Sequence, residues 1–237
     1  MNRNLGKCIV ICIGILSCFA YALDPVPDLM RLTGGKRVKL IWKHFDKAAP
    51  EKGGTIICFD SDSGKQVEIR GGLQDDVQGP YITPLGNRVV FGTPDTETRV
   101  MDWNGANEKS IAKGKPVAVW IDTSTAIEWV YIFANGKSSP VWRYQIDNPG
   151  TKELIWDKSV FDNNFTVSKD GTHAGTQLWP DCGIATIPNG TFSILGQGCW
   201  PNIAPDNSYR FFHFYNSHSI IKIYPPDIQV LIQPLSL

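Results

Sequence analysis

Residues 82–91 read Ile-Thr-Pro-Leu-Gly-Asn-Arg-Val-Val-Phe, which is a Pro-Leu-Gly-Asn turn followed at once by a β-branched, apolar run. A Gly/Asn turn beside such a run predicts two paired strands joined by a tight connection. The same element recurs at 167–174 and 203–212, with weaker copies at 34–38 and 122–126. The repeat length is therefore about 43 residues, within the range of repeat architectures.

A second series of turns lies between the copies of the first. The glycines of these turns are Gly64, Gly105, Gly150 and Gly190, and each follows an Asx-rich or Pro-Asn sequence. Two turn series with one period divide each repeat into four short strands. Four-stranded antiparallel sheets repeating at this length predict an all-β fold, a β-propeller of four-stranded blades. An ordinary β-sandwich with irregular hairpins is the alternative.

The repeats place five blades on the chain and leave short segments at both ends. We predict an incomplete or truncated ring, in which the tail 225–237 can add a closing strand. Residues 23–35 form a lead-in before the first blade. The predicted blades are 36–72, 73–114, 115–156, 157–198 and 199–224.

Composition narrows the class of protein. The 237 residues include 23 basic and 23 acidic side chains, and this balance argues against a nucleic-acid partner. Hydrophobic residues make up 42% of the chain, enough to form a core.

The amino end predicts export. Residues 1–22 contain Arg3 and Lys7, then a short apolar run ending Ala20-Tyr21-Ala22, which is typical of a secretory signal peptide. Cleavage there gives a periplasmic or secreted protein. Two alternatives stay open: an uncleaved membrane anchor, and a lipoprotein attached through Cys18, because Ile15-Leu16-Ser17-Cys18 is similar to a lipobox. We expect no other contact with a membrane.

The segment 80–91, continued by 99–107, resembles one blade of the TolB-type, WD40-like β-propellers. The resemblance covers 36–224 with departures in the turns, since Leu85 stands where that family has Asp. It implies architecture and leaves the function open, because such propellers serve as scaffolds, receptors and enzyme bodies.

Blade topology separates two rims. The first and third turns of each meander lie on one rim, and the middle loop and the link to the next blade lie on the other, which we call the second rim. The first rim holds the tight turns described above. Binding residues usually lie on irregular loops of a rigid scaffold, so we expect the ligand at the second rim.

Aromatic and histidine residues supply the ligand-binding candidates. Exposed aromatic rings beside polar groups suit a sugar ring or a peptide, whereas interblade packing is the alternative. The histidines form a weak candidate set for a divalent metal, since no tight ligand motif accompanies them and we expect no obligatory cofactor. The ligand-binding candidates are Trp179, Asp181, Trp200, His213, His218 and His44, and the metal candidates are His44, His213 and His218.

Three cysteines lie outside the predicted signal peptide: Cys58, Cys182 and Cys199. Cys182 begins the third strand of the fourth unit and Cys199 follows its fourth strand. We therefore predict a Cys182–Cys199 disulfide in the oxidising compartment, with Cys58 in the core and two buried thiols as the alternative.

The sequence supports three hypotheses of function. The first is an exported, non-catalytic propeller that recognises a protein or glycan through the second rim. The second is a glycan-active lyase or hydrolase with a His/Asp site at the channel mouth; secreted propellers that cleave uronate-rich glycans are similar in layout. The third is a degraded paralogue without a function of its own.

Overall fold

The computed structural model describes residues 25–48, 53–73, 79–134, 140–161 and 164–225, and these contain eighteen strands and one helix. The predicted signal peptide, with Cys18, and the predicted closing strand after residue 225 lie outside the described residues. Among the described residues no helix is long and apolar enough to cross a membrane.

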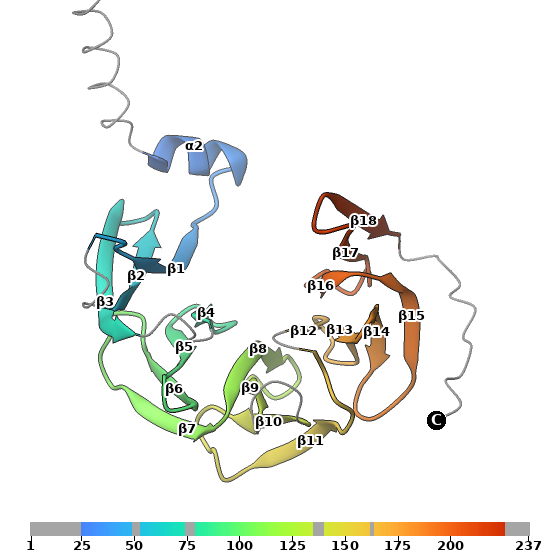
Figure 1. Ribbon diagram of the computed structural model, residues 1–237. Helices are drawn as coiled ribbons and strands as arrows, with labels where there is room; N and C mark the ends of the chain where they lie inside the picture. The colour runs from blue at the N-terminus through green and yellow to red at the C-terminus, as the bar shows by residue number, and fades with distance from the viewer. Residues whose placement is uncertain (1–24, 49–52, 74–78, 135–139, 162–163, 226–237) are drawn as a thin grey trace, which may run out of the picture. The chain divides into compact units, whose positions relative to one another are not determined.

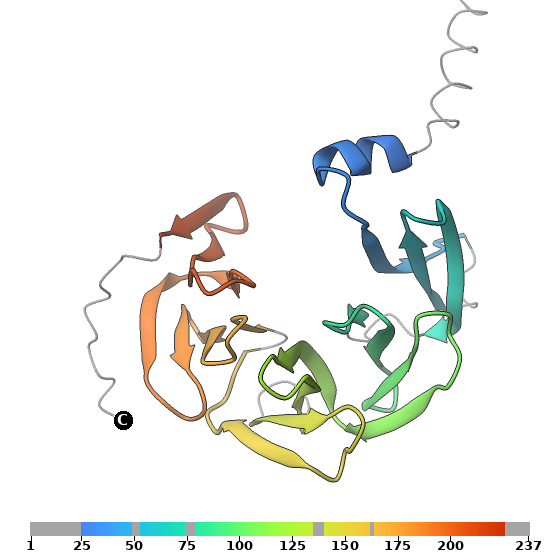
Figure 2. The ribbon, with the colours of Figure 1, turned by 180° about the vertical axis from the view of Figure 1, so that it is seen from behind.

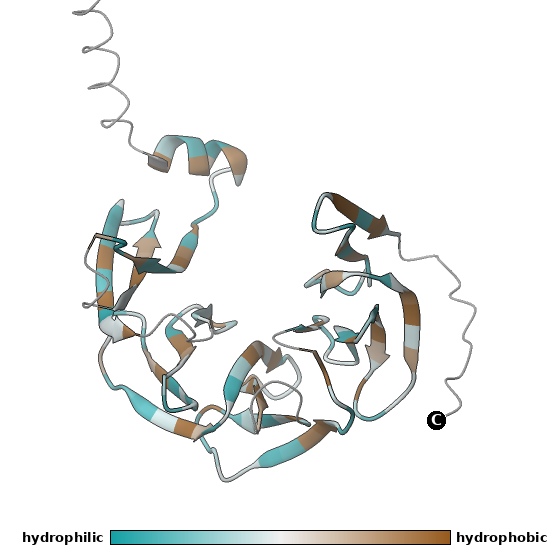
Figure 3. Ribbon diagram, viewed as in Figure 1, coloured by the Kyte–Doolittle hydropathy of each residue, from teal (hydrophilic) through white to brown (hydrophobic). Residues whose placement is uncertain are grey.

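The strands form five antiparallel meanders in chain order (Figures 1 and 2). Hydrophobic bands fall on the strands in Figure 3. The first two sheets contain β1 (Lys39–Phe45), β2 (Gly54–Asp60) and β3 (Lys65–Leu73), then β4 (Tyr81–Ile82), β5 (Arg88–Gly92), β6 (Glu97–Asp102) and β7 (Lys109–Lys113).

The later sheets complete the order. The third sheet contains β8 (Lys115–Asp122), β9 (Ile127–Phe133), β10 (Val141–Gln145) and β11 (Lys152–Trp156), and the fourth contains β12 (Phe165–Val167), β13 (His173–Leu178), β14 (Asp181–Thr186) and β15 (Phe192–Gln197). The fifth contains β16 (Cys199–Ile203), β17 (Phe211–Tyr215) and β18 (Ile220–Tyr224). The all-β propeller-type fold is thus confirmed.

The first and fifth sheets differ from the prediction of four strands in every blade. Each has three strands among the described residues. Before β1 the chain forms the helix α2 (Pro25–Leu32) instead of a strand. The sequence pattern gave no sign of this helix because Pro25 and Pro27 interrupt it, although prolines are tolerated in a first helical turn.

The chain divides into two compact units, of which the first combines the residues up to Leu40 with Cys58–Val67. In this unit the Arg37 guanidinium pairs with Asp60 and with Asp62. The hydrogen bond from Arg37 holds the pKa of Asp60 below its usual value. The Val38 amide also donates to Ser61 Oγ at 2.9 Å, so this turn is fixed from two sides.

The second unit combines Ile41–Ile57 with Glu68–Leu237 and contains part of the first sheet and the other four sheets. Successive sheets of this unit pack side by side, since β8 contacts both β5 and β12, and β16 contacts β13 and β14. The largest apolar core of the unit involves the β8–β11 and β12–β15 sheets. Its largest members are Tyr131, Phe133, Trp156 and Phe165.

Tight turns of the first rim join each sheet of the second unit to the next. They use backbone groups and side-chain donors and acceptors, so the polar groups of this rim hold neighbouring sheets together. The hydrogen bonds are Leu85 N to Glu128 Oε1 at 2.8 Å, Trp120 Nε1 to Lys169 O at 2.8 Å, and Asp170 N to Asn207 Oδ1 at 2.9 Å.

Candidate functional site

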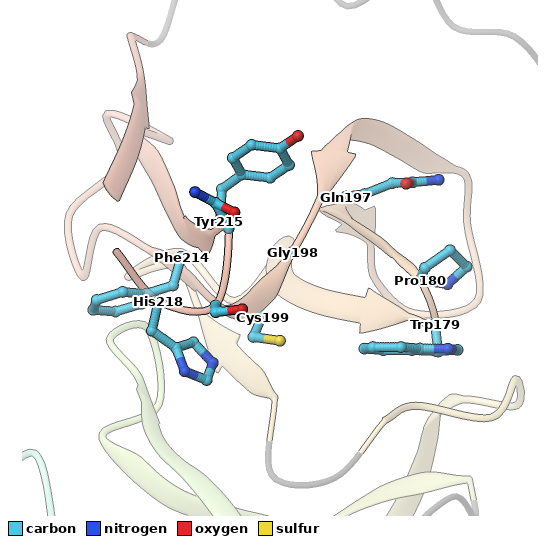
Figure 4. Close-up of a pocket in the computed structure, with 10 residues that line it drawn as sticks. Trp179, Pro180, Gln197, Gly198, Cys199, Phe214, Tyr215 and His218 are labelled. Carbon is cyan, nitrogen blue, oxygen red and sulfur yellow. The ribbon is translucent and has the colours of Figure 1, made fainter. Parts of the chain in front are cut away.

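A pocket of about 280 Å³ lies at the second rim, where the fourth and fifth sheets meet (Figure 4). Three segments line it: the β13–β14 loop, the β15–β16 link and the β17–β18 loop. The lining residues are Trp179, Pro180, Gln197, Gly198, Cys199, Phe214, Tyr215, Asn216, Ser217 and His218.

Trp179 forms one wall of the pocket. It lies in the two-residue connection between β13 and β14, so the strands on both sides fix its backbone. Its side chain is 63% exposed, and its ring packs against that of Phe161 with centroids 5.0 Å apart. The indole therefore presents a supported apolar surface to solvent.

His218 lies at the other side of the pocket from Trp179 (Figure 4), and Trp200, which is outside the lining, stacks on it. The two rings are stacked, with centroids 4.5 Å apart and planes at 8°. Phe214 meets the Trp200 ring edge-on at 5.5 Å. Trp200 does not itself line the pocket, but it orients two rings that do.

The loop that carries His218 has an unusual backbone. Asn216, Ser217 and His218 have φ angles of 50°, 52° and 67°, three successive residues in the left-handed region. This conformation costs energy for residues other than glycine, and such strain is concentrated at functional sites. The Ser219 amide and hydroxyl both donate to the Asn216 carbonyl oxygen, which closes the turn.

A buried polar chain holds the link between β15 and β16. Asn164 Nδ2 donates to Gln177 Oε1 at 2.8 Å, and Gln177 Nε2 donates to the Gly198 carbonyl oxygen at 2.5 Å. The Gln177 side chain is fully buried, so its amide is committed to this role. The pocket floor is thus preorganised by groups that do not reach solvent.

His213 lies beneath this floor. It is fully buried, and its Nε2 lies 3.2 Å from the Tyr224 hydroxyl. Burial lowers the pKa of His213, which favours a neutral ring. An added Cβ on Gly198 would collide with the His213 ring and with the Phe214 carbonyl oxygen, so only glycine fits there.

The structure separates the sequence-based candidates. Trp179 and His218 line the pocket, Trp200 supports it and His213 lies under it. Asp181 begins β14 and is outside the lining, and His44 is an exposed residue of β1 that is also outside it.

The residues of the pocket do not fit a bound divalent metal. The lining offers one imidazole and one thiol, from His218 and Cys199. In the part of the chain that the structure describes, no three His, Cys, Asp or Glu side chains are grouped closely enough to share an ion. His44, His213 and His218 therefore do not form a common site there.

The predicted Cys182–Cys199 disulfide is not present, and both residues are free thiols. The prediction placed them on neighbouring strands of one hairpin. Cys199 instead begins β16 of the fifth sheet, opposite Phe214, whereas Cys182 lies on β14 of the fourth sheet, opposite Gly196. Burial raises the pKa of Cys182 to about 12, so this thiol is protonated at neutral pH.

Several lining residues escaped the sequence analysis. Phe214 and Tyr215 belong to an aromatic strand that looks like core, whereas Gln197 and Gly198 lie in the segment 196–200, which the blade pattern assigns to the second rim. The signal that was present is the Asn-Ser-His sequence of the β17–β18 loop, since Asn and His tolerate a positive φ better than most residues.

No protein-family model and no curated protein matches the sequence. Solved structures do match, and those named here are consistent with a β-propeller fold. One is an oligogalacturonate lyase in complex with manganese, at 10% identity and a TM-score of 0.56 over 79% of this chain and 61% of that one. Another is a nidogen/laminin complex, at 10% identity and a TM-score of 0.55 over 79% and 71%.

A third match is the oligogalacturonate lyase of Vibrio parahaemolyticus, at 11% identity and a TM-score of 0.53 over 79% of this chain. This chain spans 61% of the length of each of the two lyases. At such low identity the likeness shows the propeller-type fold. The neighbours include both a catalytic propeller and a protein-binding one, so the fold alone fits both classes.

Proposed function

We propose that this protein is an exported, TolB-type β-propeller that binds a glycan or protein partner at the Trp179 pocket. The observation that carries the proposal is a pair of aromatic walls, Trp179 and His218, each supported from behind by a second ring. Concave sites lined by aromatic rings with a few polar groups are typical ligand sites.

The energetics of the two rims support a binding role. The polar groups of the first-rim turns form hydrogen bonds between neighbouring sheets. The second-rim pocket instead leaves Trp179 mostly in solvent and keeps a strained loop at 216–218. Exposed aromatic area and local strain both lower stability unless a partner covers or uses them.

The glycan-active enzyme is a less favoured hypothesis. A lyase or hydrolase needs a paired acid and base or a metal centre close to the reacting bond. The described lining contains no carboxylate and a single imidazole. Binding without turnover therefore fits the lining side chains better. The experiment below also detects turnover, which would favour the enzyme.

The full chain is expressed, and the purified protein is incubated with a glycan array and with a panel of immobilised extracellular-matrix proteins. The amount of protein captured is measured. The variants are Trp179→Ala and, as a matched control, Leu85→Ala, which removes an equally exposed apolar side chain from the first rim (58% against 63%). We expect Trp179→Ala to abolish capture and Leu85→Ala to keep it. Equal capture by all three proteins would overturn the site, and release of an unsaturated or hydrolysed sugar product would favour the enzyme.

A further inference from the structure

The charge of the pocket narrows the class of ligand. Among the described residues, the ten that line it include no Lys, Arg, Asp or Glu. Outside the lining, the Lys222 ammonium lies 3.9 Å from the centre of the Tyr215 ring and is engaged by it. Carboxylate and phosphate ligands are usually held by arginine forks or lysines, so an anionic ligand lacks partners in this lining.

The two aromatic walls suit a ring-shaped ligand with apolar faces. Trp179 is backed by Phe161, and His218 is backed by Trp200. In Figure 4 these walls lie on opposite sides of the pocket, with the Cys199 sulfur between them. Rigid aromatic planes supply contact area at little entropic cost, and the C–H faces of a pyranose ring match such planes.

Apart from the His218 imidazole and the Cys199 thiol, the polar side chains of the lining are amides and hydroxyls. Gln197 and Asn216 carry amides, and Ser217 and Tyr215 carry hydroxyls. Each of these groups can both donate and accept a hydrogen bond, as a sugar hydroxyl does. A charged peptide or a lipid headgroup has no comparable match here.

The volume of the pocket suits a small ligand. It is about 280 Å³, at the small end for ligand pockets, which matches one or two sugar rings.

We infer that the ligand of the Trp179 pocket is a neutral carbohydrate, one or two uncharged pyranose rings of a longer glycan held between Trp179 and His218. This inference rests on the proposed function and gives its site a ligand class. It distinguishes the protein from the oligogalacturonate lyases of similar fold, since an oligogalacturonate is a uronate polymer.

The test is isothermal titration calorimetry with three sets of probes. The first set is neutral gluco-, xylo-, manno- and galacto-oligosaccharides, the second is oligogalacturonates of the same lengths, and the third is proline-rich and acidic peptides. We expect at least one neutral probe to bind, with an affinity that changes less than about twofold between about 20 and 500 mM salt, because no ion pair forms. Trp179→Ala should weaken this binding about tenfold or more, Trp179→Phe about threefold or less, and Leu85→Ala should leave it unchanged.

The possible failures are separable. Tighter binding of oligogalacturonate or peptide than of any neutral sugar, still lost in Trp179→Ala, would overturn the neutral-sugar inference and leave the proposed site intact. Neutral-sugar binding that Trp179→Ala does not weaken would overturn the site itself. If the wild-type protein unfolds cooperatively, and is therefore folded, yet binds no neutral probe at millimolar concentration, the inference is also overturned.

Discussion

The imidazole of His218 lies flat on the indole of Trp200, with ring centroids 4.5 Å apart and planes at 8°. His218 belongs to the β17–β18 loop, and Trp200 belongs to β16. One stacked pair therefore fixes a loop of the second rim against the first strand of the same sheet. The opposite pocket wall comes from another sheet, so the two walls are positioned independently.

Trp200→Ala is expected to loosen the pocket without unfolding the protein. Trp200 is 57% exposed, so its removal costs little core packing, whereas His218 loses the surface that orients it. We expect the affinity of the ligand to fall about five- to tenfold, because an aromatic pair contributes about 0.5–1.5 kcal/mol beyond burial. Calorimetric titration and thermal unfolding measure the two effects, and Trp200→Phe should restore most of the affinity. Unaltered affinity in Trp200→Ala would show that the stack has no part in the site.

The left-handed turn makes a second prediction. Ser217 has a φ of 52°, which glycine adopts freely and a β-branched residue adopts only with strain. Ser217→Val should lower the free energy of unfolding by about 1–3 kcal/mol, whereas Ser217→Gly should change it by less than about 1 kcal/mol. Urea unfolding of the two variants gives the comparison. Equal destabilisation by both substitutions would contradict the observed turn.

The link between the second and third sheets depends on a buried charge. Arg88 Nη2 lies 2.5 Å from Glu128 Oε2, and the Glu128 side chain is 1% exposed. Arg88→Met leaves that carboxylate buried without its partner, and we expect a loss of about 3–5 kcal/mol of unfolding free energy.

The matched control is the double variant Arg88→Met/Glu128→Gln. An amide at position 128 removes the charge but keeps an oxygen acceptor for the Leu85 amide. Denaturant unfolding should show that the double variant recovers more than half of the stability lost by Arg88→Met. No recovery would mean that packing, not the unpaired charge, causes the loss.

The link between the fourth and fifth sheets predicts a pH dependence. Burial raises the pKa of Asp170, but hydrogen bonds from Ser168, Tyr209 and Thr172 outweigh it and hold the pKa well below its usual value. A carboxylate with a lowered folded-state pKa contributes stability above its unfolded pKa of about 3.9, and this contribution is lost as the pH falls toward the folded value.

Tyr209→Phe should therefore cost about 1 kcal/mol of unfolding free energy at neutral pH, since the hydroxyl donates to a half-exposed charged acceptor. The difference from the wild type should shrink as the pH is lowered below about 4, where the unfolded carboxyl becomes protonated. Unfolding curves at both pH values make the comparison. The Tyr209 ring also packs against that of His173, with centroids 4.4 Å apart. A difference that is as large in acid as at neutral pH would assign the loss to this packing.

Much of the fold could be predicted because its repeats are local. The turns at Gly105, Gly150 and Gly190 each join the last two strands of a four-stranded sheet, as their spacing predicts. The number of strands in the first and fifth sheets was not predicted correctly, because the repeat pattern does not determine how many strands the sheets at its two ends contain.

The site was less predictable because it forms between three loops that no local pattern connects. Trp179 and His218 stand out as aromatic residues on second-rim loops. The packing of neighbouring segments determines whether a strand residue such as His213 faces the pocket or the core. Here Gly198 packs against the His213 ring and separates it from the pocket. The predicted Cys182–Cys199 disulfide is not found: both cysteines are free, on β14 and β16 of neighbouring sheets.

The most direct measurement of the central claim uses Cys199 as a reporter of the pocket. Cys199 is half-buried in the lining, whereas Cys58 and Cys182 are buried and burial raises their pKa to about 11 and about 12. Alkylation requires the thiolate, so iodoacetamide should label Cys199 first, as peptide mass mapping can show. We predict that a saturating neutral oligosaccharide slows labelling of Cys199 about fivefold or more, by covering the thiol between Trp179 and His218. An oligosaccharide that binds in solution and leaves the labelling rate of Cys199 unchanged would contradict the account.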